Sequence, residues 1–271
     1  MRRAVLIVFA LVVVAGVGIV WFAVRKITLS PPDCTVAAVD SSGAAFDLTP
    51  EQAGNAATIA AVGLRLGMPD HAVTVAVATA LQESKLTNVS SGDRDSAGLF
   101  QQRPSQGWGT YAQVTDPVYA ATAFYDHLRA LPNWRQLSVT QAAQEVQHSA
   151  APDAYAQWES EARAVAVALV GQTPADLTCH DLTIAAPSTD LAALATAEWG
   201  TATVTGPHDT ARGWAISSWL VAHATQLGVD RVSFAGRTWT AASGTWAKDS
   251  SATDSLTLHQ VPAGTTTSAR G

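Results

Sequence analysis

The sequence predicts a mainly α-helical protein with three parts: an N-terminal transmembrane helix, an all-α domain and a small C-terminal α/β domain. Three features carry this prediction. Residues 4–24 form a long uncharged run, residues 49–171 show only helical periodicity, and short β-rich segments follow residue 200. The chain has 271 residues and is 48% apolar, which is enough for more than one hydrophobic core.

The first 26 residues predict a signal-anchor helix. No charge interrupts residues 4–24, and basic residues flank the run on both sides: Arg2, Arg3, Arg25 and Lys26. At about 1.5 Å per residue the run spans about 31 Å, close to the thickness of a bilayer core. A cleaved signal peptide has a shorter apolar region of about 7–15 residues. We therefore expect a single-pass protein of the cell membrane, with the C-terminal bulk of the chain extracellular.

The chain has two cysteines, Cys34 and Cys179. A disulfide between them would tie the ends of an exported domain together, and it requires an oxidising compartment. Two buried free thiols are the alternative. Two distant cysteines are too few for a metal site, and we expect no metal there.

The charge balance limits the partners. Four of the sixteen basic residues lie in the first 26, so residues 27–271 carry 12 Lys and Arg against 22 Asp and Glu, a net charge of −10. Such an acidic domain is not expected to bind nucleic acid. A single membrane span also cannot form a transport pathway by itself.

Residues 49–179 predict the all-α domain, after a loose stalk at residues 27–48. Its helices are marked by start signals: an N-cap residue followed by proline, a capping box, or a capping aspartate. The second helix is expected to end near Leu86, which puts Glu83 in its last turn. The signals place the helix starts at Thr49-Pro50, Asp70, Asp116-Pro117, Ser138 and about Pro152.

Residues 180–261 predict the α/β domain. One amphipathic helix is expected from Ala211 to Leu227, with Gly228 as its stop. A tail at residues 262–271 is rich in Thr, Ser and Gly and is expected to be disordered. The expected strands are residues 201–205, 231–236, 237–240 and 255–261.

Glu83 is the candidate catalytic residue. It lies at the C-terminal end of a helix, where the helix dipole disfavours negative charge, and its neighbours in sequence are apolar. Both effects raise the pKa of its carboxyl group. A carboxylic acid that stays protonated near neutral pH can donate a proton to a glycosidic oxygen. The alternative is an ordinary solvated glutamate at a helix end.

The run ALQES, followed by a polar loop and GLFQQ, resembles the E-S … G-L-M-Q pattern of the lysozyme-like lytic transglycosylases. The likeness covers roughly residues 50–170. The stretch GDRDSAGLFQQRPSQGWGT (92–110) is most similar to an actinobacterial group of membrane-anchored proteins in that broad family. The resemblance implies a lysozyme-like fold, peptidoglycan glycan strands as the substrate, and no cofactor.

The resemblance also implies roles for particular residues. Glu83 matches the acid and base that cleaves the bond between N-acetylmuramic acid and N-acetylglucosamine, and then closes a 1,6-anhydro ring without water. Ser84 matches a residue that orients the substrate or the acid. Gly98 to Gln101 match the floor of the cleft. The A-Y-N motif of the family has no clean counterpart, and Tyr155 is the nearest candidate, either as a cleft hydroxyl or as a packing residue.

Other side chains are candidates for binding sugar. Trp108, Tyr111 and Trp134 offer aromatic faces for pyranose rings, although Trp134 equally suits a core. Gln102 and Arg103 offer hydrogen bonds to N-acetyl or peptide groups. Two alternatives to a transglycosylase remain open: a hydrolytic lysozyme and a non-catalytic wall-binding scaffold.

Asp93 and Asp95 bear on the choice between transglycosylase and lysozyme. A second carboxylate across from Glu83 would favour water as the nucleophile and therefore hydrolysis. Turn-forming aspartates that cap local backbone N–H groups are the alternative interpretation of both residues.

The segment from Ala211 to Thr240 resembles, more weakly, a module related to zinc D-Ala-D-Ala carboxypeptidases. In that module a D-H-V-H strand supplies zinc ligands. Here Asp254 remains, but Ser255 and Thr257 stand at the two histidine positions. Because catalytic zinc needs three protein ligands, we expect this copy to bind no metal.

Overall fold

The computed structural model describes residues 31–39, 44–262 and 267–268, and its described residues from Pro32 onward form one compact unit. The predicted signal-anchor helix lies outside the described residues, as does most of the predicted tail. Within the described ranges, no helix is both long and apolar enough to span a bilayer.

The helices begin largely where the sequence signals place them. Thr49 and Ser138 each form a capping box, and the Asp116 side chain caps a third helix. Asp70 differs, because it is the first helical residue and Pro69 stands at the N-cap. The helices of this part are α2 (Pro50–Arg65), α3 (Asp70–Ser84), α4 (Tyr111–Val114), α5 (Pro117–Ala130), α6 (Val139–Gln147) and α7 (Glu159–Leu169), with short 3₁₀ turns at Pro104–Gln106, Trp134–Gln136 and Pro152–Trp158.

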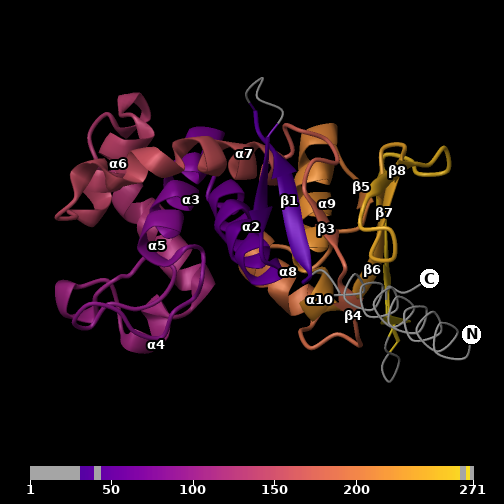
Figure 1. Ribbon diagram of the computed structural model, residues 1–271, viewed down its shortest axis with the longest axis horizontal. Helices are drawn as coiled ribbons and strands as arrows, with labels where there is room; N and C mark the ends of the chain where they lie inside the picture. Colours follow the sequence, from indigo (N-terminus) through magenta and orange to yellow (C-terminus); the bar gives the residue numbers. More distant parts are fainter. Residues whose placement is uncertain (1–30, 40–43, 263–266, 269–271) are drawn as a thin grey trace, which may run out of the picture. The chain divides into compact units, whose positions relative to one another are not determined.

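The expected all-α domain is wrong as a fold class, because strands are built into it. β1 (Asp33–Ala37) pairs antiparallel with β2 (Ala45–Leu48) and with β3 (Thr178–His180), in the order β2-β1-β3. Residues expected to form a loose stalk therefore supply two strands. The described chain therefore combines helices with antiparallel sheets (Figure 1).

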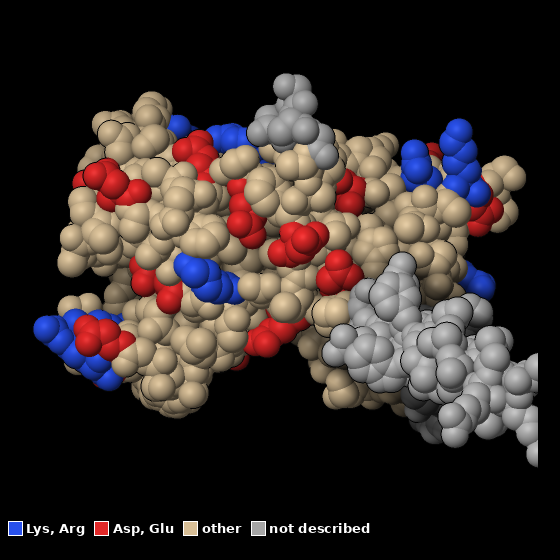
Figure 2. Space-filling model, viewed as in Figure 1, with Lys and Arg blue, Asp and Glu red and all other residues tan. Residues whose placement is uncertain are grey.

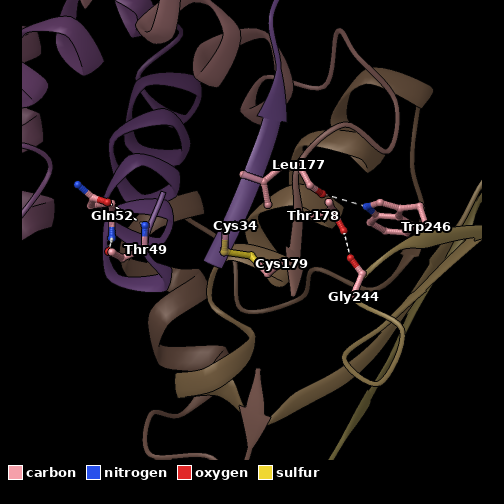
Figure 3. The surroundings of a disulfide bond; sticks show 8 residues. All are labelled: Cys34, Thr49, Gln52, Leu177, Thr178, Cys179, Gly244 and Trp246. Atoms are coloured by element: carbon pink, nitrogen blue, oxygen red, sulfur yellow. Dashed lines mark hydrogen bonds between the residues drawn. A yellow bond between two sulfur atoms is a disulfide. The ribbon is translucent and has the colours of Figure 1, made fainter. Parts of the chain in front are cut away.

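A disulfide between Cys34 and Cys179 joins β1 to β3, as the sequence predicted. Both cysteines are fully buried. Figure 3 shows the bond together with two contacts that hold the other side of β3. Thr178 Oγ1 donates to the Gly244 carbonyl, and Trp246 Nε1 donates to the Leu177 carbonyl at 3.0 Å. β3 therefore connects the N-terminal strand to the C-terminal part of the chain.

The C-terminal part is built on an antiparallel five-stranded sheet of order β5-β9-β6-β7-β8. Three expected strands are confirmed, but residues 201–205 form no strand, and the predicted long helix is divided at His223. β4 pairs with β10 (Thr267–Ser268). The remaining elements are β4 (Thr183–Ile184), α8 (Leu191–Trp199), β5 (Gly206–Pro207), α9 (Thr210–Ala222), α10 (Ala224–Leu227), β6 (Val229–Phe234), β7 (Arg237–Thr240), β8 (Trp246–Lys248) and β9 (Ser255–Gln260).

α9 lies between α2 and the five-stranded sheet and contacts both (Figure 1). A buried glutamate on α8 strengthens this junction. Glu198 Oε1 accepts from Thr58 Oγ1 of α2 at 2.8 Å, and its Oε2 accepts from Trp219 Nε1 of α9 at 2.6 Å. Glu198 is only 2% exposed. Both carboxylate oxygens are thus satisfied inside the protein, which a buried carboxylate requires.

Acidic side chains dominate the surface around β1 and α2. Figure 2 shows Asp and Glu gathered over the middle of this face, with few Lys or Arg between them. The distribution agrees with the excess of acidic residues in the sequence.

Candidate active site

Glu83 lies in the last turn of α3, where the sequence placed it. The helix ends because Lys85 and Leu86 both adopt left-handed backbone conformations, each with φ of 56°. The Leu86 N–H donates back to the Ala80 carbonyl at 3.1 Å, and the Leu86 side chain is fully buried. A buried apolar residue just past the cap is a common way to fix a helix end. This arrangement sets the position of the Glu83 side chain.

The loop with the GLFQQ sequence is fastened beside Glu83. Ser84 Oγ donates to the Leu99 carbonyl at 2.7 Å, and Gln147 Nε2 of α6 donates to the Phe100 carbonyl at 2.8 Å. Gly98 has φ of +77°, and a Cβ there would lie 2.0 Å from the Val114 carbonyl oxygen. Only glycine fits at that position.

The carboxyl group of Glu83 has a protein donor on each of two other elements. Tyr155 Oη donates to Glu83 Oε1 at 2.8 Å, and the Gln147 amide also donates to this carboxylate. Burial raises the pKa of Glu83, while the hydrogen bonds from Tyr155 and Gln147 and the charge of Lys85 act in the opposite direction. Burial is the largest influence, so the acid form persists to higher pH than in a solvated glutamate.

Tyr155 lies in the 3₁₀ turn Pro152–Trp158, directly before α7. Its side chain is fully buried, and burial together with the neighbouring Glu83 raises the pKa of its hydroxyl. The hydroxyl is therefore a neutral donor at physiological pH. The ring of Tyr155 packs in the core, as the packing interpretation expected, and its hydroxyl donates to Glu83 at 2.8 Å.

A second cluster, formed by Gln82, Lys85 and Trp158, lies next to Glu83. Trp158 Nε1 donates to Gln82 Oε1 at 2.8 Å, and Lys85 Nζ lies 4.0 Å from the centre of the Trp158 ring. Burial lowers the pKa of Lys85. Sequence reasoning missed this cluster and Gln147. Lys85 lies only two residues after Glu83 in the sequence, so their proximity could have been predicted, but no motif pointed to Gln147 or Trp158.

The polar residues predicted to bind substrate are mostly engaged in the protein. Ser84 Oγ holds the loop, as described above. Gln101 accepts from Ser96 Oγ at 3.1 Å and donates to the Gly98 carbonyl at 3.1 Å. Gln102 is 1% exposed and donates to the Ala120 carbonyl. These three side chains therefore stabilise the loop that faces Glu83.

The predicted aromatic residues differ in exposure. Tyr111 is 53% exposed, and its hydroxyl donates to the Ser90 carbonyl at 2.7 Å. Trp108 is half-buried and stacks on His127, with ring centroids 4.0 Å apart. Trp134 is buried between His71 and Arg135 and belongs to the core. Tyr111 offers the most open aromatic surface of the three.

Asp95 has a local role. Its carboxylate accepts from the Ser105 N–H at 2.7 Å, from Ser105 Oγ at 3.0 Å and from Arg103 Nε at 3.0 Å. These hydrogen bonds lower the pKa of Asp95 to about 2. Asp93 is largely exposed and lies 3.9 Å from Arg94. The contacts of Asp95 are those of an aspartate that organises a turn.

In the part of the chain that the structure describes, no group of three His, Cys, Asp or Glu side chains lies close enough together to hold a metal ion. In the five-stranded sheet, Thr257 of β9 pairs with Ser233 of β6, and Asp254 precedes β9.

The sequence matches no protein-family model and no curated protein. The resemblance to lytic transglycosylases therefore stays a prediction.

Proposed function

We propose that this protein is a lytic transglycosylase that cleaves the glycan strands of peptidoglycan, with Glu83 as its single acid and base. The observation that carries the proposal is the 2.8 Å hydrogen bond from Tyr155 to Glu83. Tyr155, the nearest candidate for the tyrosine of the A-Y-N motif, thus contacts the candidate acid directly. The half-buried carboxyl group with a raised pKa is a further reason.

The reaction uses one carboxyl group twice. Protonated Glu83 gives its proton to the oxygen between N-acetylmuramic acid and N-acetylglucosamine, and the bond from C1 to that oxygen breaks. The Glu83 carboxylate then takes the proton of the muramyl 6-hydroxyl as O6 bonds to C1. The products are a free 4-hydroxyl on one strand and a 1,6-anhydro ring on the other. Tyr155 and Gln147 hold the carboxylate between the two steps.

The contacts of Asp95 favour a transglycosylase over a hydrolytic lysozyme. A water-activating base requires a carboxylate free to accept a proton. The hydrogen bonds from Ser105 and Arg103 occupy Asp95 and stabilise its charged form. The substrate's own 6-hydroxyl then serves as the nucleophile.

The Cys34–Cys179 disulfide supports a location outside the cytoplasm, because such bonds persist in oxidising compartments. Peptidoglycan lies in that compartment, so the location and the proposed substrate agree.

The proposal is tested by incubating the purified protein with peptidoglycan and weighing the released muropeptides by mass spectrometry. Products one water lighter than reducing-end muropeptides are expected. Reducing-end products would instead identify a lysozyme. Binding to several wall preparations with no release would identify a scaffold and contradict the proposal.

Replacing Tyr155 by phenylalanine is expected to shift the pH profile. The hydroxyl favours the charged carboxylate, so its loss raises the pKa of Glu83 further, and the fall in activity at high pH moves to higher pH. The rate at the optimum is expected to fall about tenfold, equivalent to about 1.4 kcal/mol. The measurement is muropeptide release across a pH series.

Tyr125→Phe is the matched control for this variant. Tyr125 is also fully buried, and its hydroxyl donates to the Ile59 carbonyl at 3.0 Å rather than to Glu83. Both variants lose one hydrogen bond, which is worth about 1 kcal/mol of stability. Only Tyr155→Phe is expected to move the pH profile, and equal profiles for the two variants would refute the role given to Tyr155.

A further inference from the structure

The outer face of the five-stranded sheet carries a polar pocket. Alternation along β6 separates the two faces: Val232 and Phe234 are buried, while Arg231 and Ser233 point the other way. Phe234 packs on Trp214 of α9, with ring centroids 5.5 Å apart, so the buried face is the one that α9 covers. The pocket, about 430 Å³, is lined by Arg231, Ser233, Thr238, Asp249, Ser251, Thr257, Leu258 and His259.

Strand register brings the lining residues together. Ser233 in the central strand pairs with Thr238 of β7 on one side and with Thr257 of β9 on the other. Arg231, two residues earlier, pairs with His259 of β9. A row of hydroxyls therefore lies beside a guanidinium group and an imidazole. The volume falls within the range of about 300–1,000 Å³ typical of small-molecule sites.

The acidic groups of the pocket are already satisfied by the protein. Asp249 accepts from Thr238 Oγ1 at 2.7 Å, from the Ser251 N–H at 2.9 Å and from Ser251 Oγ at 2.6 Å. These bonds lower the pKa of Asp249 to about 2 and keep it charged. Asp230, just outside the lining, accepts from His259 Nδ1 at 2.6 Å. Neither carboxylate needs a ligand.

The donors of the pocket are not satisfied in the same way. Among the described residues, Arg231 makes no hydrogen bond and no ion pair through its side chain, and neither does the Thr257 hydroxyl. Ser233 Oγ lies 2.8 Å from Thr238 Oγ1, and because Thr238 gives its one proton to Asp249, the Ser233 hydroxyl is the donor in this pair. A guanidinium group has five N–H donors in a plane that fits carboxylate and phosphate oxygens. The Arg231 guanidinium and the Thr257 hydroxyl are therefore donors with no acceptor among the described residues.

We propose that this pocket binds an oxyanion, a phosphate or carboxylate group of a small polar ligand, through the Arg231 guanidinium and the Thr257 hydroxyl. Asp249 fixes the loop after β8 that closes one side of the site, and Leu258 provides its apolar contact. The site is independent of Glu83 and of the proposed glycan cleavage.

The test is a titration of the isotope-labelled full-length protein, followed by NMR. Three probes share one carbon skeleton: glycerol 1-phosphate, glycerate and glycerol. Saturable shifts are expected for the backbone amides of Ser233 and Thr257 with at least one of the two anions, and none with neutral glycerol. Preference for glycerol 1-phosphate assigns the site to phosphates, and preference for glycerate assigns it to carboxylates.

Arg231→Gln is expected to weaken binding of the preferred anion at least tenfold. Arg237→Gln is the matched control, because Arg237 lies on the neighbouring strand but does not line the pocket, and it is expected to stay within twofold of the unmodified protein. The same spectra report whether each variant is folded. Absence of saturable shifts at the pocket with both anions, or equal affinity in Arg231→Gln, would overturn the proposal.

Discussion

Replacing Glu83 with glutamine is expected to abolish muropeptide release while the protein stays folded. Glutamine has nearly the same shape and still accepts the Tyr155 hydrogen bond, but it can neither donate nor take up the catalytic proton. General acid–base catalysis contributes about 10²–10⁴-fold to a rate, so the rate of muropeptide release should fall at least about 100-fold. The measurement is the initial rate of muropeptide formation, followed by mass spectrometry.

Stability gives an independent expectation for the same variant. Because folding raises the pKa of Glu83, the folded protein binds this proton more tightly than the unfolded chain does. The contribution of Glu83 to stability is therefore greatest below the ordinary pKa of glutamate, and it declines as pH rises toward the raised value. Because glutamine does not titrate, the Glu83→Gln variant lacks this decline of stability with rising pH. Near neutral pH, urea unfolding should show Glu83→Gln to be at least as stable as the unmodified protein.

Glu161→Gln is the matched control. Glu161 on α7 is also half-buried, and burial raises the pKa of its carboxyl group. No Tyr155 hydroxyl is bound to it. We expect its activity to stay within a few-fold of the unmodified protein. If Glu161→Gln lost activity and Glu83→Gln kept it, the assignment of the acid would be wrong.

Removing the disulfide is expected to have the largest effect on stability. The bond joins residues 145 positions apart, and closing a loop of that length stabilises the folded state by about 4–5 kcal/mol in the chain-entropy model. A double variant, Cys34→Ala with Cys179→Ala, should show this loss in its free energy of unfolding in urea. The effect is large because β1 is held to β3 far along the chain.

Reduction supplies the control for the double variant. A thiol reductant should destabilise the unmodified protein to about the level of the double variant, and it should leave the double variant unchanged. An unmodified protein that unfolds at the same urea concentration with and without reductant would contradict the expected contribution of the bond.

The sequence predicted the elements whose signals are local. Thr49 and Ser138 indicate helix starts because their side chains cap the next few N–H groups. β1 and β2 were missed because β1 depends on pairing with β3, which no short segment reveals. α8 was missed because its residues are apolar or small on every side, so its helical period is weak.

The candidate site likewise combines features that local sequence predicts with contacts that depend on distant parts of the chain. The position of Glu83 in the last turn of its helix follows from residues close together in the sequence. The contacts from Tyr155 and Gln147 to Glu83 come from elements far along the chain, and packing alone brings them together. The sequence could therefore place the candidate acid but not the donors that surround it.

The buried Glu198 has a consequence for anyone who shortens this chain. A fragment that ends near residue 180 would keep α2 but lose α8 and α9, and with them the partner of Thr58. It would also lose the packing over Gly54, where a methyl group added to the glycine would lie only 3.3 Å from His223 Nδ1. A buried surface rich in alanine would become exposed to water. We expect such a fragment to aggregate during expression, so the cleavage and binding assays need the intact polypeptide.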